Sequence, residues 1–85
     1  MFDLRIIGTK NVLYDGTALS VACDGTETEY EFLSFHSNAT GVLRRGDIII
    51  NNRYKVSVKG GVVGFYDNKC LILCEEQYNP LFKDP

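Results

Sequence analysis

The stretch Asp15-Gly16-Thr17-Ala18-Leu19-Ser20-Val21-Ala22-Cys23-Asp24-Gly25, residues 15–25, decides the fold. Between its two turn dipeptides, Leu19, Val21 and Cys23 alternate with small or polar residues. This two-residue period is typical of a half-buried strand. Asp15-Gly16 is a turn dipeptide that can supply the positive φ angle a tight reversal needs, and Asp24-Gly25 marks the next turn. The stretch therefore predicts a strand with one face in the core and a turn at each end.

The same alternation of short strands and turns continues along most of the chain. From residue 54 to 59 it predicts that Tyr54, Val56 and Val58 face inward, and in residues 26–36 it separates Tyr30 and Phe32 from a charged face. Further strands are expected at residues 4–7, 12–14, 48–50, 62–66 and 70–74. Turns are expected at Asn51-Asn52 and Asp67-Asn68. Gly60-Gly61 is expected to break or bulge the sheet, and Asn38–Gly41 to be a loop or a distorted segment.

No window shows the apolar spacing of an amphipathic helix. The predicted fold class is all-β, a two-sheet β-sandwich of about 8–10 short strands. With 85 residues the chain is expected to form a single domain. We expect this domain to occupy residues 1–76 and to be followed by a short tail, residues 77–85.

Composition excludes several classes of function. The net charge is −2 and the basic residues are scattered, which argues against nucleic acid or an anionic membrane surface as a partner. The sequence has no apolar run of membrane-spanning length and no signal-peptide pattern. We therefore expect the protein to work in a reducing compartment.

The three cysteines are expected to be buried thiols. If Cys70 to Cys74 is a strand, their Cα atoms are roughly 13 Å apart, whereas a disulfide needs less than about 7 Å. Without a further pair of Cys or His ligands at suitable spacing, the two also make a poor zinc site.

Each candidate for chemistry is weak. His36 is the only histidine, and a lone histidine is usually a surface residue or a hydrogen-bonded structural one. Glu27, Glu29 and Glu31 share one strand face at about 6.6 Å spacing, too far apart to close on one calcium ion without other ligands. They are read either as a solvated face or as an acidic contact edge. No catalytic residue, metal or cofactor is predicted, so elimination favours a binding or assembly role.

Six motifs in order resemble the sandwich domain of the F-type ATP synthase epsilon subunit, over roughly residues 3–76 and with almost no gaps. They are Leu4-Arg5-Ile6-Ile7, Leu13-Tyr14-Asp15-Gly16, Thr17–Cys23, Leu43-Arg44-Arg45-Gly46-Asp47-Ile48, Val58-Lys59-Gly60-Gly61-Val62-Val63 and Asn68-Lys69-Cys70-Leu71-Ile72-Leu73. The family's central motif, Gly-Glu-aliphatic-Gly-aliphatic-Leu-Pro-x-His-Ala-Pro-Leu, is matched only in part. Glu29 and His36 are kept, while both glycines and both prolines are replaced.

The resemblance implies a non-catalytic subunit of the central stalk, or rotor, that links the gamma subunit to the membrane rotor ring during proton-driven ATP synthesis. By position in the family motif, Glu29 and His36 are implied to face the ring, with Glu31 beside them. The implied location is the cytoplasmic face of the cell inner membrane, or the matrix side of an organelle inner membrane, without direct membrane insertion.

The family commonly continues into a C-terminal helical hairpin that inhibits ATP hydrolysis. The sequence contains no such segment, so we expect a form that has only the sandwich. The rival hypothesis is a free-standing intracellular β-sandwich adaptor that binds a peptide or small ligand. A broad apolar patch on one sheet face would favour the stalk subunit, and a deep, enclosed pocket would favour the adaptor.

Overall fold

A computed structural model describes residues 1–77, and every regular element in that range is a strand. The eight strands are β1 (Phe2–Ile7), β2 (Val12–Ala18), β3 (Ser20–Asp24), β4 (Glu29–Leu33), β5 (Ala39–Leu43), β6 (Gly46–Ile50), β7 (Tyr54–Tyr66) and β8 (Lys69–Glu76). The predicted all-β fold class is therefore confirmed. Apart from Gln77, the predicted tail at residues 77–85 lies outside the described residues.

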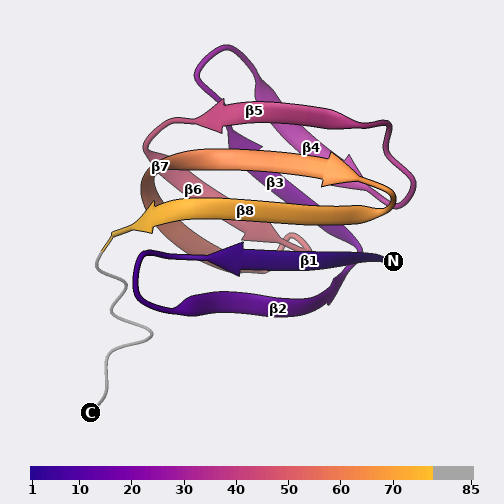
Figure 1. Ribbon diagram of the computed structural model, residues 1–85, viewed down its shortest axis with the longest axis horizontal. Helices are drawn as coiled ribbons and strands as arrows, with labels where there is room; N and C mark the ends of the chain where they lie inside the picture. The colour runs from indigo at the N-terminus through magenta and orange to yellow at the C-terminus, as the bar shows by residue number, and fades with distance from the viewer. Residues whose placement is uncertain (78–85) are drawn as a thin grey trace.

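The strands form one continuous sheet that folds back on itself into two layers (Figure 1). The strand order is β2-β1-β8-β7-β6-β3-β4, and β5 pairs with β7. The front layer consists of β5, the C-terminal half of β7, β8, β1 and β2, and the back layer of the N-terminal half of β7, β6, β3 and β4. Most pairs are antiparallel, but β1 runs parallel to β8.

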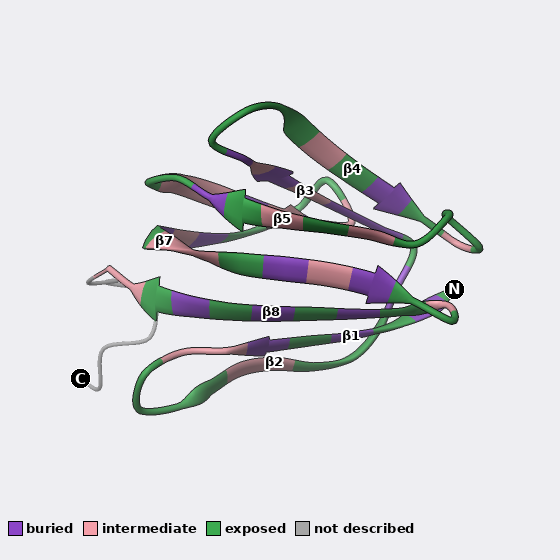
Figure 2. Cartoon of the chain, turned by 45° about the horizontal axis from the view of Figure 1, so that its top comes forward, coloured by how far each residue is buried: buried purple, intermediate pink, exposed green. Residues whose placement is uncertain are grey.

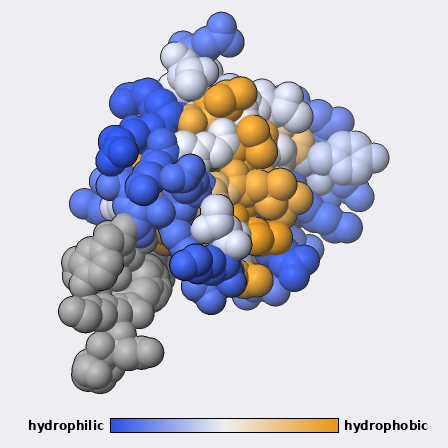
Figure 3. Space-filling model, turned by 60° about the vertical axis from the view of Figure 1, so that its left-hand side comes forward, coloured by the Kyte–Doolittle hydropathy of each residue, from blue (hydrophilic) through white to orange (hydrophobic). Residues whose placement is uncertain are grey.

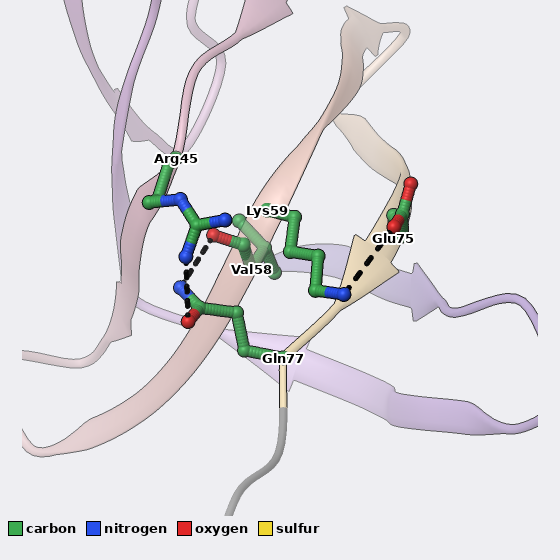
Figure 4. Close-up of polar contacts among 5 residues, drawn as sticks. All are labelled: Arg45, Val58, Lys59, Glu75 and Gln77. Atoms are coloured by element: carbon green, nitrogen blue, oxygen red, sulfur yellow. Dashed lines mark hydrogen bonds and ion pairs between the residues drawn. The ribbon is translucent and has the colours of Figure 1, made fainter.

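β7 belongs to both layers because it bends at a bulge. Its first half pairs with β6, its second half pairs with β5 and β8, and its register against β8 shifts between Val58 and Gly60. The side chain of Gln77 donates to the Val58 carbonyl at 3.0 Å and accepts from Arg45 at 3.1 Å (Figure 4). The register shift places the bulge at Lys59, one residue before the Gly60-Gly61 pair at which the sequence predicts a break or bulge. Gln77 provides a partner for a carbonyl beside it.

The core lies between the two layers and follows the alternation of the strands. Figure 2 shows buried and exposed residues alternating along β8, as its burial pattern requires. The largest fully buried side chains are Phe2, Phe32, Phe65, Leu4, Ile6, Ile48, Ile50, Ile72, Val21 and Val58. At about 1.5–3 kcal/mol each, these aliphatic and aromatic side chains are the main stabilising contribution to the fold.

The structure corrects two predictions made from residues 15–25. The turn predicted at Asp15-Gly16 is wrong, because β2 continues through both residues without reversing and Gly16 lies opposite Leu4 in β1. The chain reverses earlier, where the Gly8 amide donates to the Asn11 carbonyl at 2.8 Å. Leu19 is also not in the core but 64% exposed. It lies between β2 and β3, so the alternation restarts there as the chain passes from one layer to the other.

Two further predictions are wrong and two are confirmed. Tyr54 is 55% exposed because it begins β7 directly after the turn, where its ring lies under the Arg53 guanidinium. The sequence predicts a loop or a distorted segment at Asn38–Gly41, but this segment contributes three residues to β5, which pairs regularly with β7. The hairpin turns at Asn51-Asn52 and Asp67-Asn68 are confirmed, since all four residues have φ between 52° and 56°.

Candidate functional site

The outer surface of the front layer carries a row of exposed apolar side chains. The strand registers place Val42 of β5 opposite Val62 of β7, and Val62 opposite Leu73 of β8. They are 56%, 46% and 44% exposed, and Leu71 nearby is 44% exposed. We call these four side chains the front face. Figure 3 shows apolar side chains gathered on one side of the molecule, with hydrophilic ones around them.

A shallow groove of about 580 Å³ follows the front face. The four front-face side chains line it, with Glu27 and Tyr30 from the region of β4 at its margin. The groove is open to solvent along its length, whereas small-ligand sites are usually concave and bury most of the ligand. Its form suits a protein surface better than a small molecule, which disfavours the rival ligand-binding hypothesis.

The outer surface of the back layer is acidic. Glu29 and Glu31 are exposed on β4 and line a second shallow groove with Asp24 and Asp47. Arg44 lies 3.9 Å from Asp24, and Lys55 lies 3.9 Å from Asp47. The structure therefore brings Glu29 and Glu31 together, and it gives the two sandwich surfaces different chemistry.

His36 lies apart from these glutamates, beyond the opposite end of β4. Its ring packs edge-on against Phe32, at 4.8 Å between ring centroids, and against Phe65, at 5.6 Å. Its Nδ1 lies 2.6 Å from the Ser37 carbonyl oxygen. The residue is exposed overall, yet one side of its ring covers the aromatic end of the core, a structural contact that the sequence did not predict.

The loop after β4 meets two other segments at one end of the sandwich. In Figure 1 the connection from β4 to β5, the turn from β7 to β8 and the N-terminus lie together at the right. Asn68 joins them: its Oδ1 accepts from the Phe35 amide at 2.7 Å, and its Nδ2 donates to the Met1 carbonyl at 3.0 Å. We call this region the loop end. Sequence reasoning missed it because the three segments are far apart in the chain.

The cysteines are free thiols in the core, as the sequence predicts. Burial, and then the charge of Asp24, raises the pKa of Cys23 to about 12. Burial and the neighbouring Cys23 raise the pKa of Cys70 to about 12, and burial and Glu76 raise that of Cys74 to about 11. Neutral, buried thiols of this kind are poor nucleophiles. Within residues 1–77, no three His, Cys, Asp or Glu side chains cluster closely enough to hold a metal ion.

Comparison with known proteins finds one related sequence. Over 76 residues the chain is 36% identical to the ATP synthase epsilon chain of Sulfurimonas denitrificans, a match that covers 85% of this chain and 58% of that relative. The chain is thus similar in sequence to part of an ATP synthase epsilon chain. The resemblance predicted from the six motifs is therefore confirmed, and the chain spans less than two thirds of this relative's length. No protein-family model matches the chain.

Solved structures share the fold of the epsilon-like sandwich. One chain of the Tetrahymena thermophila mitochondrial ATP synthase, from a cryo-EM structure of the central stalk and c-ring, matches with a TM-score of 0.74 at 16% identity, covering 91% of this chain and 65% of its own length. A chain of the Euglena gracilis mitochondrial ATP synthase, from a structure of OSCP, F1 and c-ring, matches with a TM-score of 0.78 at 16% identity, with 95% and 54% covered. Within residues 1–77, no helix has the length and apolar character needed to cross a membrane.

Proposed function

We propose that this chain is a non-catalytic central-stalk subunit of an F-type ATP synthase that links the gamma subunit to the membrane rotor ring. The observation that carries the proposal is the exposed apolar front face, since such patches mark protein interfaces. The similarity to an epsilon chain and to chains from ATP synthase structures supports the choice of complex. The role is mechanical, because torque driven by proton flow passes through the stalk and this domain clamps gamma to the ring.

The two partners take different surfaces in this proposal. Gamma covers the front face, where Val62 lies between Val42 and Leu73 and forms the centre of the apolar row. The membrane rotor ring contacts His36. The acidic pair Glu29 and Glu31 lies to one side of this contact and attracts basic groups of the rotor ring. The domain, residues 1–76, is then a peripheral part of a membrane complex, on the cytoplasmic face of the cell inner membrane or the matrix side of an organelle inner membrane.

The gamma contact is tested by placing a charge in the middle of the front face. Val62→Lys puts an ammonium group where the interface is expected to be dry, so affinity for purified gamma should fall at least roughly tenfold. Because Val62 is 46% exposed in the free chain, the melting temperature should stay near that of the wild type. Binding is measured by titration calorimetry or by pull-down with tagged chain.

Leu19→Lys is the matched control. Leu19 is 64% exposed and lies between β2 and β3, away from the front face. This variant carries the same added charge and should bind gamma like the wild type. If Val62→Lys binds gamma with wild-type affinity, the front face is not the gamma surface. If the wild type fails to bind gamma at all, the proposed function is wrong.

A further inference from the structure

β4 is an edge strand of the back layer and pairs on one side only. Its register against β3 runs from Ser20 opposite Leu33 to Asp24 opposite Glu29, and no described strand lies on its other side. Figure 2 shows β4 at the upper margin of the sandwich with no strand beyond it. The outer side of β4 is therefore a place where another extended chain can add to the sheet.

The hydrogen bonds of β4 fix which of its backbone groups point to this free side. The Gly25 amide donates to the Thr28 carbonyl at 2.8 Å, so Thr28 turns its carbonyl toward β3. Backbone groups alternate in direction along a strand, so Tyr30 and Phe32 also turn theirs toward β3. The residues between them point their N–H and C=O groups away from β3: Glu29, Glu31 and Leu33.

Most of these outward groups are unpaired. The Leu33 carbonyl accepts from the His36 amide at 3.2 Å, and the Glu29 carbonyl accepts from the Thr28 hydroxyl at 3.3 Å. The amides of Glu29, Glu31 and Leu33 and the carbonyl of Glu31 have no partner within residues 1–77. Unpaired groups at every second residue are the pattern that an added strand needs, because main-chain hydrogen bonds supply much of its affinity.

The side chains of β4 select the chemistry of an added strand. Glu29 and Glu31 are exposed, and neither belongs to the four ion pairs found within residues 1–77. Leu33, on the same face, is 53% exposed. A lysine or arginine directly opposite each glutamate forms a favourable cross-strand pair, and an apolar residue suits Leu33.

A second copy of this chain is a poor occupant of the same edge. Two-fold pairing of β4 with itself over its full length places Glu31 opposite Glu31, and like charges directly opposite each other destabilise a sheet. Charged residues on edge strands protect proteins against this kind of self-pairing. The same two glutamates therefore act against another copy and favour a strand of opposite charge.

We propose that the free edge of β4 binds an extended basic segment of a partner protein, which adds to the back layer as an antiparallel strand. From its N-terminus the segment reads apolar-apolar-basic-apolar-basic, with the basic residues opposite Glu31 and Glu29. Its inner apolar residues lie beside Phe32 and the half-buried Tyr30. The inference goes beyond the proposed function, because it rests on the sheet edge and on neither gamma nor the rotor ring. A strand bound there would neutralise the two glutamates and weaken their attraction for the ring.

The probe is a fluorescein-labelled synthetic peptide, Val-Val-Lys-Val-Lys, and fluorescence anisotropy at low salt measures its binding to the full chain. Replacing both lysines of the peptide with glutamate should weaken binding at least about fivefold. N-methylation of the first lysine removes a ladder hydrogen bond opposite Glu31 and should also weaken binding at least about fivefold. The double variant Glu29→Lys, Glu31→Lys should reverse the preference and bind the glutamate peptide more tightly.

Asp15→Lys is the matched control, because Asp15 lies on the other outer strand, β2, and its side chain is 64% exposed. This variant should bind the lysine peptide like the wild type, and circular dichroism should show that both variants stay folded. Equal affinity of the wild type for the lysine and glutamate peptides, or for the N-methylated peptide, would overturn the inference. So would the absence of binding, while gamma binding would still decide the proposed function separately.

Analytical ultracentrifugation tests the remaining occupant, a second copy. The wild type should sediment as a monomer. Glu31→Pro removes the outward amide of Glu31, and proline is tolerated on an edge strand where the N–H faces solvent. Wild-type dimers that Glu31→Pro converts to monomers would assign the edge to self-association and overturn the inference.

Discussion

Replacing Gly61 with alanine tests whether β7 can cross between the layers only because it lacks a side chain at this point. A Cβ on Gly61 would lie 2.8 Å from the Cα of Cys74 and would overlap the carbonyl oxygen of Leu73. Carbon–carbon contacts begin near 3.5 Å, so the Cys74 contact alone would require β7 and β8 to separate by about 0.7 Å, and the overlap with the Leu73 oxygen requires more. Both obstructing atoms belong to the backbone of β8 and cannot turn aside as a side chain can.

The cost of Gly61→Ala can be estimated from three contributions. Overpacking costs about 1–3 kcal/mol, and disturbing one or two ladder hydrogen bonds beside the Gly61–Cys74 pair costs about 1 kcal/mol each. Alanine has less conformational entropy than glycine in the unfolded chain, which stabilises the variant by about 0.5–1 kcal/mol. The net loss is about 3 kcal/mol, out of a total stability of roughly 4–13 kcal/mol for a domain of this length.

Urea and thermal unfolding followed by far-ultraviolet circular dichroism measure this loss. The melting temperature of Gly61→Ala should fall by about 12–24 °C. Gly64→Ala is the matched control on the same strand, because its added Cβ meets nothing closer than the Thr40 methyl at 4.0 Å. The control should be neutral or slightly stabilising. Equal melting temperatures for Gly61→Ala and the wild type would refute the close approach of β7 to β8 and, with it, the proposed geometry of the bend.

Two other predictions concern the core thiols and the acidic surface. Folding raises the pKa of Cys70 from 9.0 to about 12, so the unfolded chain loses this proton first and stability should fall as pH rises above about 9. Urea midpoints at pH 8 and pH 10.5 measure the decline, which should be shallower in Cys70→Val; equal slopes would contradict the assigned pKa. Glu29→Lys should change stability by less than about 0.5 kcal/mol because Glu29 is exposed. It should also weaken ring binding most at low salt, and a salt-independent affinity would exclude an electrostatic role.

The local patterns of the sequence determined the fold class and the hairpins. Alternation in residues 56–58 and 70–74 predicted which side chains enter the core, because a strand must place successive side chains on opposite faces. The turns at Asn51-Asn52 and Asp67-Asn68 were predictable because asparagine and aspartate tolerate positive φ. The order of six motifs was enough to indicate the resemblance to the epsilon subunit, since order and spacing together are far more specific than any one motif.

Only the tertiary structure decided where the alternation breaks and which surfaces the fold creates. Leu19 looks like part of a strand because local periodicity does not register a passage between layers, and Asp15-Gly16 remains extended because pairing with β1 outweighs its turn propensity. The front face joins β5, β7 and β8, and the loop end joins Met1, Phe35 and Asn68. Both are built by long-range strand pairing, which brings distant segments together through contacts that no local window of the sequence contains.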